Sequence, residues 1–408
     1  MSDSRRVFAG FAIYSFAFGS MFPRMVDIRA AMGVEEGALG LALIGAPLGT
    51  LLSLTFAGPL LARIGNRVVL LAGIVLLALG YAVAIHATGP LALFLLLVPV
   101  GLVIGGVEII LNLEADRVEH AEGRRIMNRA HAFWSFGFMS AGLFGAVMAG
   151  IGLSPQVHLA LVVPLTVLAV WLFLADFVPA TPRAEDGAPA RRFAAPTWPI
   201  LVLVCVTLPA MLLEGGSIDW AAIYMTDTFQ SGAFLSGLAV AVVTGFQALT
   251  RFFADAYVQR HSPAAVARWL LGVLLLGNLI VVLSPSAMVS LAGFALIGIG
   301  ASVMFPLAMS AAARRTDRPA ALNVAALAQF SFMIFLLAPP FLGLIAEHFG
   351  IRNAFALGLP LIALGFLTVS SLGEEAARDR VGARHPRGRW DATPARPGAP
   401  PTTRTRPP

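Results

Sequence analysis

Residues Pro90 to Leu113 read PLALFLLLVPVGLVIGGVEIILNL, and this stretch contains one ionisable side chain, Glu108. A helix rises about 1.5 Å per residue and the hydrocarbon core of a bilayer is about 30 Å thick, so about 20 apolar residues cross it. The stretch meets that requirement. It therefore predicts a transmembrane helix.

Similar apolar runs recur along the whole chain, separated by short polar, Gly or Pro breaks. With 58% hydrophobic residues, 12% charged residues and a mean hydropathy of +0.82, the chain is far more apolar than a soluble domain. We therefore predict an all-α membrane protein with about twelve transmembrane helices in two six-helix bundles. The predicted runs are 7–31, 37–62, 67–87, 90–113, 130–152, 156–178, 198–225, 232–254, 264–283, 287–312, 320–347 and 351–372.

The basic residues are distributed unevenly between the two sides of the predicted bundle. All 28 of them are arginine. When successive connections are assigned alternately to the two sides, only Arg24, Arg29 and Arg352 lie opposite the N-terminus. Because basic loops are retained in the cytoplasm, both termini are predicted to be cytoplasmic in a bacterial-type inner membrane. This distribution explains the high pI, about 10.5, without nucleic acid as a partner.

The longest interior polar stretch lies near the middle of the hydrophobic region. It divides the chain into an N-terminal six-helix half (1–178), a cytoplasmic linker (179–196) and a C-terminal six-helix half (197–372), followed by a disordered cytoplasmic tail (373–408). Two landmarks repeat at nearly one offset: Gly58–Ala62 matches Arg251–Asp255, and Asn128 matches Asn323. This indicates a duplicated unit with a substrate site between the halves.

The segment GPLLARIGNRVVLL, Gly58–Leu71, resembles the signature loop of the major facilitator superfamily (MFS). Ala62 stands where the family has an aspartate; the second half has Asp255, but Arg251 replaces the family's glycine there. The resemblance implies a cytoplasmic gate. The residues assigned to it are Arg63, Arg67, Arg251 and Asp255.

Three further segments resemble particular branches of that family. Glu108–Asn112 and the run from Asn128 to Gly137 are similar to motifs of fucose–proton symporters, and Glu214–Trp220 is similar to a motif of MosC-like proteins. This resemblance implies that Glu108 lines a central cavity, and it places a second carboxylate of that branch at Gly19, where this chain has none. Trp134 replaces an asparagine of the fucose transporter, which makes fucose itself an unlikely substrate for this chain.

Four polar or aromatic residues near the predicted midplane are candidates for substrate or proton binding. An ionisable group inside a membrane is costly, so Glu108 is expected to face a cavity or a partner helix. Asn112 lies one turn further on the same helical face. On the next helix, His131 can titrate near neutral pH, and Trp134 offers a flat apolar ring with one donor, or packs simply as an aromatic side chain.

The second half contributes its own candidates. Glu214 precedes a Gly-Gly pair that can loosen a helix, and Asp219 follows toward the outer end. Trp220 is expected to contact substrate or to mark the membrane interface. Gln247 and Gln329 are expected to line the cavity or to bond between helices.

A second set of charges is expected at the outer end of the first helix. Arg24 and Asp27, with Arg29 nearby, form either a periplasmic gate or a charge-compensated helix end.

The sequence thus predicts a proton-coupled secondary transporter of a small polar, sugar-like solute that works by alternating access. An MFS antiporter that exports amphipathic compounds is the first alternative, and a non-transporting membrane sensor is a remote one. An enzyme is not expected: without lysine there is no Walker A motif, and the histidines form no ligand pair at helical spacing. No metal or cofactor is expected, and a monomer is the family default.

Overall fold

The computed structural model describes residues 2–124, 126–181, 194–258 and 260–373. The predicted tail from residue 374 and linker residues 182–193 lie outside the described residues. The division into halves and linker therefore stays a prediction.

The first set of helices, called here the N-terminal set, runs from α1 to α9. It consists of α1 (Asp3–Gly19), the 3-10 turn η1 (Phe22–Arg24), α2 (Met25–Met32), α3 (Glu36–Leu43), α4 (Gly45–Phe56), α5 (Gly58–Ile64), α6 (Asn66–Ala84), α7 (Pro90–Glu122), α8 (Met127–Gly150) and α9 (Pro155–Leu174).

The C-terminal set follows from residue 198. It consists of α10 (Trp198–Phe229), α11 (Ala233–Val258), α12 (Pro263–Leu283), α13 (Ala287–Ala301), α14 (Met304–Ala313), α15 (Ala320–Phe349), α16 (Ile351–Ala356), α17 (Gly358–Thr368) and the 3-10 turn η3 (Val369–Leu372).

Among the described residues, 11 helical segments are long and apolar enough to cross a membrane, and the chain is an all-α membrane protein as predicted. The prediction was about twelve transmembrane helices, and the difference from these 11 segments lies in the first apolar run. There α1 is only 17 residues long and the run continues through η1 and α2. Pro23 lies in η1, and because proline lacks a backbone N–H it favours a break at this point.

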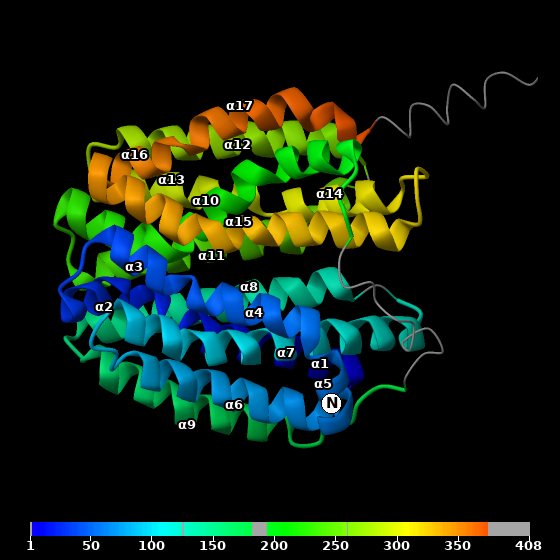
Figure 1. Cartoon of the computed structure of the whole chain (residues 1–408), viewed down its shortest axis with the longest axis horizontal. Coiled ribbons are helices and arrows are strands. Elements are labelled where there is room, and N and C mark those ends of the chain that lie inside the picture. The colour runs from blue at the N-terminus through cyan, green and yellow to red at the C-terminus, as the bar shows by residue number, and fades with distance from the viewer. Residues whose placement is uncertain (1, 125, 182–193, 259, 374–408) are drawn as a thin grey trace, which may run out of the picture. The chain divides into compact units, whose positions relative to one another are not determined.

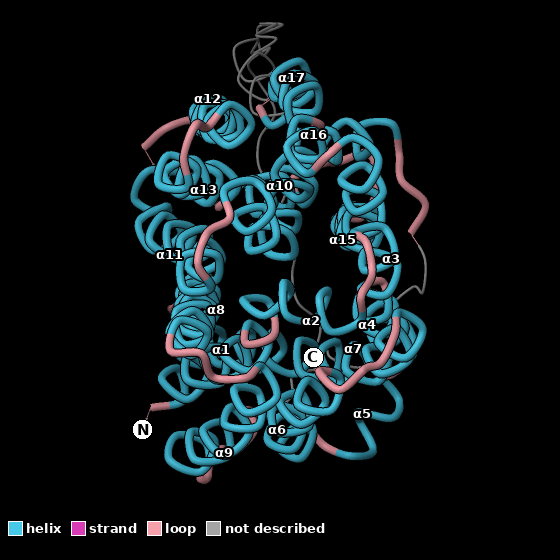
Figure 2. The backbone as a smooth tube through the Cα atoms, turned by 90° about the vertical axis from the view of Figure 1, so that its left-hand side faces the viewer, coloured by secondary structure: helices cyan, strands magenta, loops and turns pink. Residues whose placement is uncertain are grey.

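The two helix sets meet along two seams. Figure 1 shows α1–α9 in one layer and α10–α17 in the other, with α8 against α11 and α3 against α15 where the layers meet. The end-on view in Figure 2 shows the same two pairs on opposite sides of the interface.

Both seams depend on close backbone approach. A β-carbon built on Gly40 of α3 would lie 2.5 Å from the carbonyl oxygen of Pro339 in α15. On the other seam, a β-carbon on Gly142 of α8 would lie 2.9 Å from the backbone nitrogen of Ala241 in α11. Small residues allow helices to approach in this way inside a membrane.

The helix sets have two ends, which lie at opposite sides of Figure 1. The "α2 end" contains α2, the α10–α11 turn and the α15–α16 turn. The "terminal end" contains the start of α1 and the end of η3.

Candidate functional site

A cavity of about 310 Å³ lies between the N-terminal and C-terminal sets. Its volume is at the lower end of the range for small-molecule sites. Helices α1, α4, α7 and α8 supply much of one wall, and α10, α11 and α15 supply the other. The polar and aromatic lining residues are Phe11, Tyr14, Phe18, Phe22, Thr50, Tyr81, Glu108, Asn112, His131, Trp134, Glu214, Asp219, Arg251, Phe332 and Phe335.

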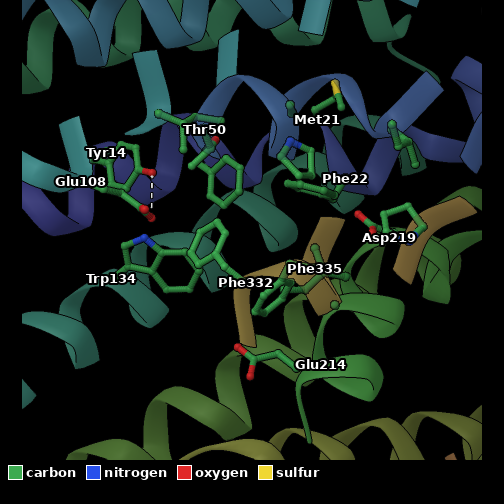
Figure 3. A pocket seen from close by; sticks show the side chains of 18 of the residues that line it. Tyr14, Met21, Phe22, Thr50, Glu108, Trp134, Glu214, Asp219, Phe332 and Phe335 are labelled. Carbon is green, nitrogen blue, oxygen red and sulfur yellow. Dashed lines mark hydrogen bonds between the residues drawn. The ribbon is translucent and has the colours of Figure 1, made fainter. Parts of the chain in front are cut away.

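The first acidic group of the cavity is Glu108 on α7. The hydroxyl of Tyr14, a fully buried side chain of α1, donates a hydrogen bond of 3.2 Å to the Glu108 carboxylate. Asn112 lies one turn away, but its amide donates to the backbone oxygen of Glu108 at 2.9 Å. Tyr14 is therefore the group that holds the carboxylate in place, as the dashed line in Figure 3 marks.

The second acidic group, Glu214 on α10, is paired with Arg251 on α11. The guanidinium nitrogen Nη2 of Arg251 lies 3.5 Å from Glu214 Oε1, and both side chains are largely buried. The same guanidinium donates to Ser135 Oγ of α8 at 3.0 Å and to the Ser302 carbonyl at 2.9 Å. Arg251 thus connects Glu214 to the opposite helix set.

The third acidic group, Asp219, lies on α10 beyond Glu214. Its side chain lines the cavity and makes no hydrogen bond or ion pair with any residue that the structure describes. Figure 3 shows Asp219, Glu108 and Glu214 on three different sides of the cavity, with Phe332 and Phe335 among them. The carboxylates are therefore separate sites rather than one cluster.

Aromatic rings cover much of the remaining wall. Trp134 and Phe138 have ring centroids 5.3 Å apart, and Phe18 lies 6.1 Å from Trp134. His131 lies against Phe11 with 5.2 Å between ring centroids. All three pairs are tilted, so none of them is the face-to-face sandwich that aromatic rings disfavour. The cavity is consequently lined by both aromatic rings and polar groups.

Six of the nine predicted binding residues line this cavity, and the other three do not. Trp220 is buried next to Gly343 of α15, and Gln247 is fully buried in α11. Gln329 accepts a hydrogen bond of 3.1 Å from the backbone nitrogen of Ala194. Successive helical residues are rotated by about 100°, so Trp220 cannot share the face of Asp219. We do not propose these three as substrate contacts.

The predicted outer gate divides into two parts. Arg24 is almost fully buried within the N-terminal set and bonds to His158, to Asp27 and to the Leu153 carbonyl. Arg29 instead reaches across the interface. Its guanidinium makes two hydrogen bonds of 2.6 Å to the carboxylate of Asp227 at the end of α10, and it also pairs with Glu36.

Of the other predicted gate residues, Arg63 is exposed on α5, and Arg67 donates to the carbonyls of Ala175 and Phe177 within its own helix set. Asp255 lies in α11, but its side chain is outside what the structure describes.

Gly19, where the family resemblance places a second carboxylate, packs tightly against α8. A β-carbon there would lie 3.0 Å from side-chain atoms of both Ala141 and Phe138 of α8. Among the lining residues from the N-terminal set, Glu108 is the acidic one.

Sequence reasoning missed Tyr14, Tyr81, Phe332 and Phe335. The spacing of Phe332 and Phe335 could have indicated a shared face, because residues three positions apart lie on the same side of a helix. Nothing in the sequence distinguished these aromatics from the lipid-facing ones, of which Phe341 and Phe253 are exposed examples.

Membrane-spanning helices in two sets with a cavity between them define a polytopic membrane protein with the architecture of a transporter. The chain belongs to the Major Facilitator Superfamily, whose family model matches residues 7–215 and again residues 203–397.

Curated relatives support that assignment. An uncharacterised MFS-type transporter of Yersinia pestis is 27% identical over 90% of this chain and 94% of its own length. The uncharacterised transporter y4wD of Sinorhizobium fredii is 31% identical over 86% of this chain and 93% of its own. The membrane protein MosC of Rhizobium meliloti is 23% identical over 83% and 82%.

Solved structures show the same fold at low identity. The nucleoside transporter NupG has a TM-score of 0.69 at 12% identity, covering 92% of this chain and 99% of its own. A bacterial homologue of the human lysosomal transporter Spinster, in an inward-facing and occupied conformation, has a TM-score of 0.63 at 18% identity, covering 95% and 98%.

Proposed function

We propose that this MFS transporter is proton-coupled and moves a small solute with both polar and apolar faces through the central cavity by alternating access. The Tyr14–Glu108 pair carries the proposal, because it places an acid that can gain or lose a proton in the wall of the cavity. Protonation of Glu108 changes its interaction with Tyr14, and this difference can bias the equilibrium between two conformations.

The proposal assigns the α2 end to the periplasm and the terminal end to the cytoplasm of a bacterial-type inner membrane. The arginine distribution supports this orientation. The contacts between the helix sets support a state that is closed on the periplasmic side. Both the Arg29–Asp227 ion pair and the close approach of Gly40 to Pro339 join the helix sets at the α2 end.

The class of solute has two candidates. A small polar, sugar-like solute taken up with protons fits Asn112, Thr50 and the carboxylates. An amphipathic compound exchanged for protons is favoured by the aromatic walls, in particular Phe332 and Phe335 of α15. Both candidates use the same cavity, and they differ in the direction of the coupled proton.

The test is proton movement in proteoliposomes that contain a pH-sensitive dye. Solutes from a panel of sugars, polyols and amphipathic amines are added outside. Entry with protons acidifies the interior, whereas exchange for protons makes it alkaline. We expect Glu108→Gln to abolish the pH signal, because the side chain keeps its shape and loses its titratable group.

Asp176→Asn, at an exposed loop position, is the matched control and is expected to keep the signal. Solute flux without any pH change in the wild-type protein would show a uniporter. A pH signal that persists in Glu108→Gln would remove Glu108 from the proposed role.

A further inference from the structure

The charges that line the cavity do not balance within the protein. Glu108, Glu214 and Asp219 are acidic, and Arg251 and His131 are the basic side chains of the lining. Arg251 is already paired with Glu214. This leaves Glu108 and Asp219 without a cationic partner among the lining residues.

Asp219 differs from Glu108 in that no side chain compensates it. Tyr14 donates to Glu108, whereas none of the described residues donates a hydrogen bond to Asp219. An ionised carboxylate in an apolar environment needs a counter-charge or hydrogen-bond donors. A cationic group that enters the cavity would supply this missing partner, and a proton on Asp219 would remove the need for one.

The surroundings of Asp219 restrict what that can be. Phe332, Phe335 and Phe22 line the same cavity and lie between Asp219 and the Glu108 side in Figure 3. The faces of aromatic rings carry partial negative charge and attract cations, and an organic ammonium group benefits most when it is desolvated. Such walls disfavour an anion, and they offer few hydrogen bonds to a polyhydroxylated neutral solute.

We propose that the substrate is an organic cation, an amine or quaternary ammonium compound with an apolar body, and that Asp219 is its counter-ion. This inference rests on the proposed function, since it names the substrate class of the same cavity. Asp219 binds the ammonium group, the phenylalanines of α15 and η1 contact the apolar body, and Glu108 remains available for the coupled proton.

The test is equilibrium binding to the purified full-length protein in detergent at one neutral pH. Two sets of matched probes are used: phenethylamine, 2-phenylethanol and phenylacetate, and the corresponding naphthyl amine, alcohol and acid. The members of each set share their apolar body and differ mainly in charge. We expect each amine to bind about tenfold or more tightly than its alcohol, and the acids to bind least.

Variants of Asp219 test whether this residue causes the preference for amines. Asp219→Asn is expected to bring the amine-to-alcohol ratio close to one, and Asp219→Glu to restore part of it. The surface control Asp176→Asn is expected to keep it. Unfolding temperatures of all variants show whether a loss reflects damage to the fold.

Three outcomes overturn the inference: amines that bind no better than alcohols, no binding of any amine, or an unchanged preference in Asp219→Asn. The last would mean that Asp219 is not the counter-ion of the amine. Because binding is measured without a pH gradient, a failure here leaves the proton-flux test of Glu108 unaffected. Conversely, a failed proton-flux test leaves the cation preference to be measured on its own.

Discussion

At the α2 end, polar contacts join the two helix sets, whereas at the terminal end they mostly stay within one set. Arg29 of α2 binds Asp227 of α10, and Glu347 of α15 accepts a hydrogen bond of 3.0 Å from the backbone nitrogen of Gly37. At the terminal end, Glu114 of α7 binds Asn66 and the backbone nitrogen of Ala180, each at 2.7 Å.

The C-terminal set has a comparable internal cluster at the terminal end. Asn323 donates to Asp317 at 2.9 Å, and Arg318 donates to the Ala195 carbonyl at 2.6 Å. These bonds lie within one set or join it to the chain segment beside it, so they can persist when the sets move. The bonds at the α2 end must break for the cavity to open there. Under the proposed alternating-access mechanism, the α2 end acts as the gate, and the contacts at the terminal end stiffen the two moving helix sets.

The largest effect is expected from Gly40→Leu. The new side chain would collide with the backbone of Pro339 and Pro340, so α3 and α15 could no longer close. We expect transport to be lost. Opening can be measured in a Cys205→Ser background that carries Phe332→Cys as a reporter in the cavity. An impermeant maleimide is added from outside. Labelling should be about tenfold or more higher with Gly40→Leu than without it, because overpacking destabilises the closed state by about 1–3 kcal/mol.

Gly272→Leu in α12 is the matched control, because a β-carbon there meets nothing within 4 Å. It is expected to leave both transport and labelling unchanged. If Gly40→Leu transports normally, the α3–α15 approach is not a gate.

A smaller opening is expected from Arg29→Gln. The side chains of Arg29 and Asp227 are 18% and 28% exposed, so the pair is only partly screened by solvent. Its loss should destabilise the closed α2 end by about 1 kcal/mol and raise labelling of Phe332→Cys about fivefold. Arg6→Gln, which removes an ion pair with Asp3 inside one set, should have no effect. Equal labelling in both variants would contradict the role of Arg29.

Glu114→Gln should lower stability without opening the cavity. The Glu114 side chain is 1% exposed and also pairs with the buried Arg117 at 3.2 Å. Losing the carboxylate weakens these bonds by about 2 kcal/mol, which lowers the melting temperature in detergent by a few degrees. Labelling of Phe332→Cys should stay at the wild-type level. An increase in labelling would mean that contacts at the terminal end also keep the cavity closed.

The smallest effect is expected at Asp317, outside the membrane-spanning helices. Partial burial alone would raise its pKa, but hydrogen bonds from Asn323 and Thr197 and the charge of Arg315 lower the pKa overall. A lowered pKa in the folded state gives stability above the unfolded pKa of about 3.9, and this stability is lost as the pH falls below it.

Asp317→Asn should therefore flatten the fall of the melting temperature between mildly acidic and strongly acidic pH by a small amount. Asp176→Asn, with its exposed side chain, is the comparison. An unchanged pH profile in Asp317→Asn would assign the acid sensitivity to other carboxylates.

Much of the cavity could be predicted from the sequence. Glu108, His131, Trp134, Glu214 and Asp219 were candidates because polar or titratable residues inside apolar runs are unusual, and all of them line it. Their roles in binding remain proposals. The phenylalanines of the cavity could not be identified, because a phenylalanine that faces lipid and one that faces a cavity have the same local pattern.

The arginines of the predicted outer gate also could not be told apart from the sequence. Arg24 and Arg29 lie five positions apart and are equally basic, yet one bonds inside the N-terminal set and the other reaches Asp227. Asp227 is 198 positions away from Arg29 in the chain. No spacing rule within one helix relates them.

The sequence by itself determined the all-helical membrane fold, the approximate helix positions and the charge asymmetry of the two sides. These depend on local properties, namely apolar run length and the composition of each loop. Only the tertiary structure decided which polar residues share the cavity, which carboxylate lacks a partner and which arginine joins the helix sets. Those outcomes depend on how each helix is rotated about its axis and on which helices pack against it. Contacts between segments far apart in the sequence determine both.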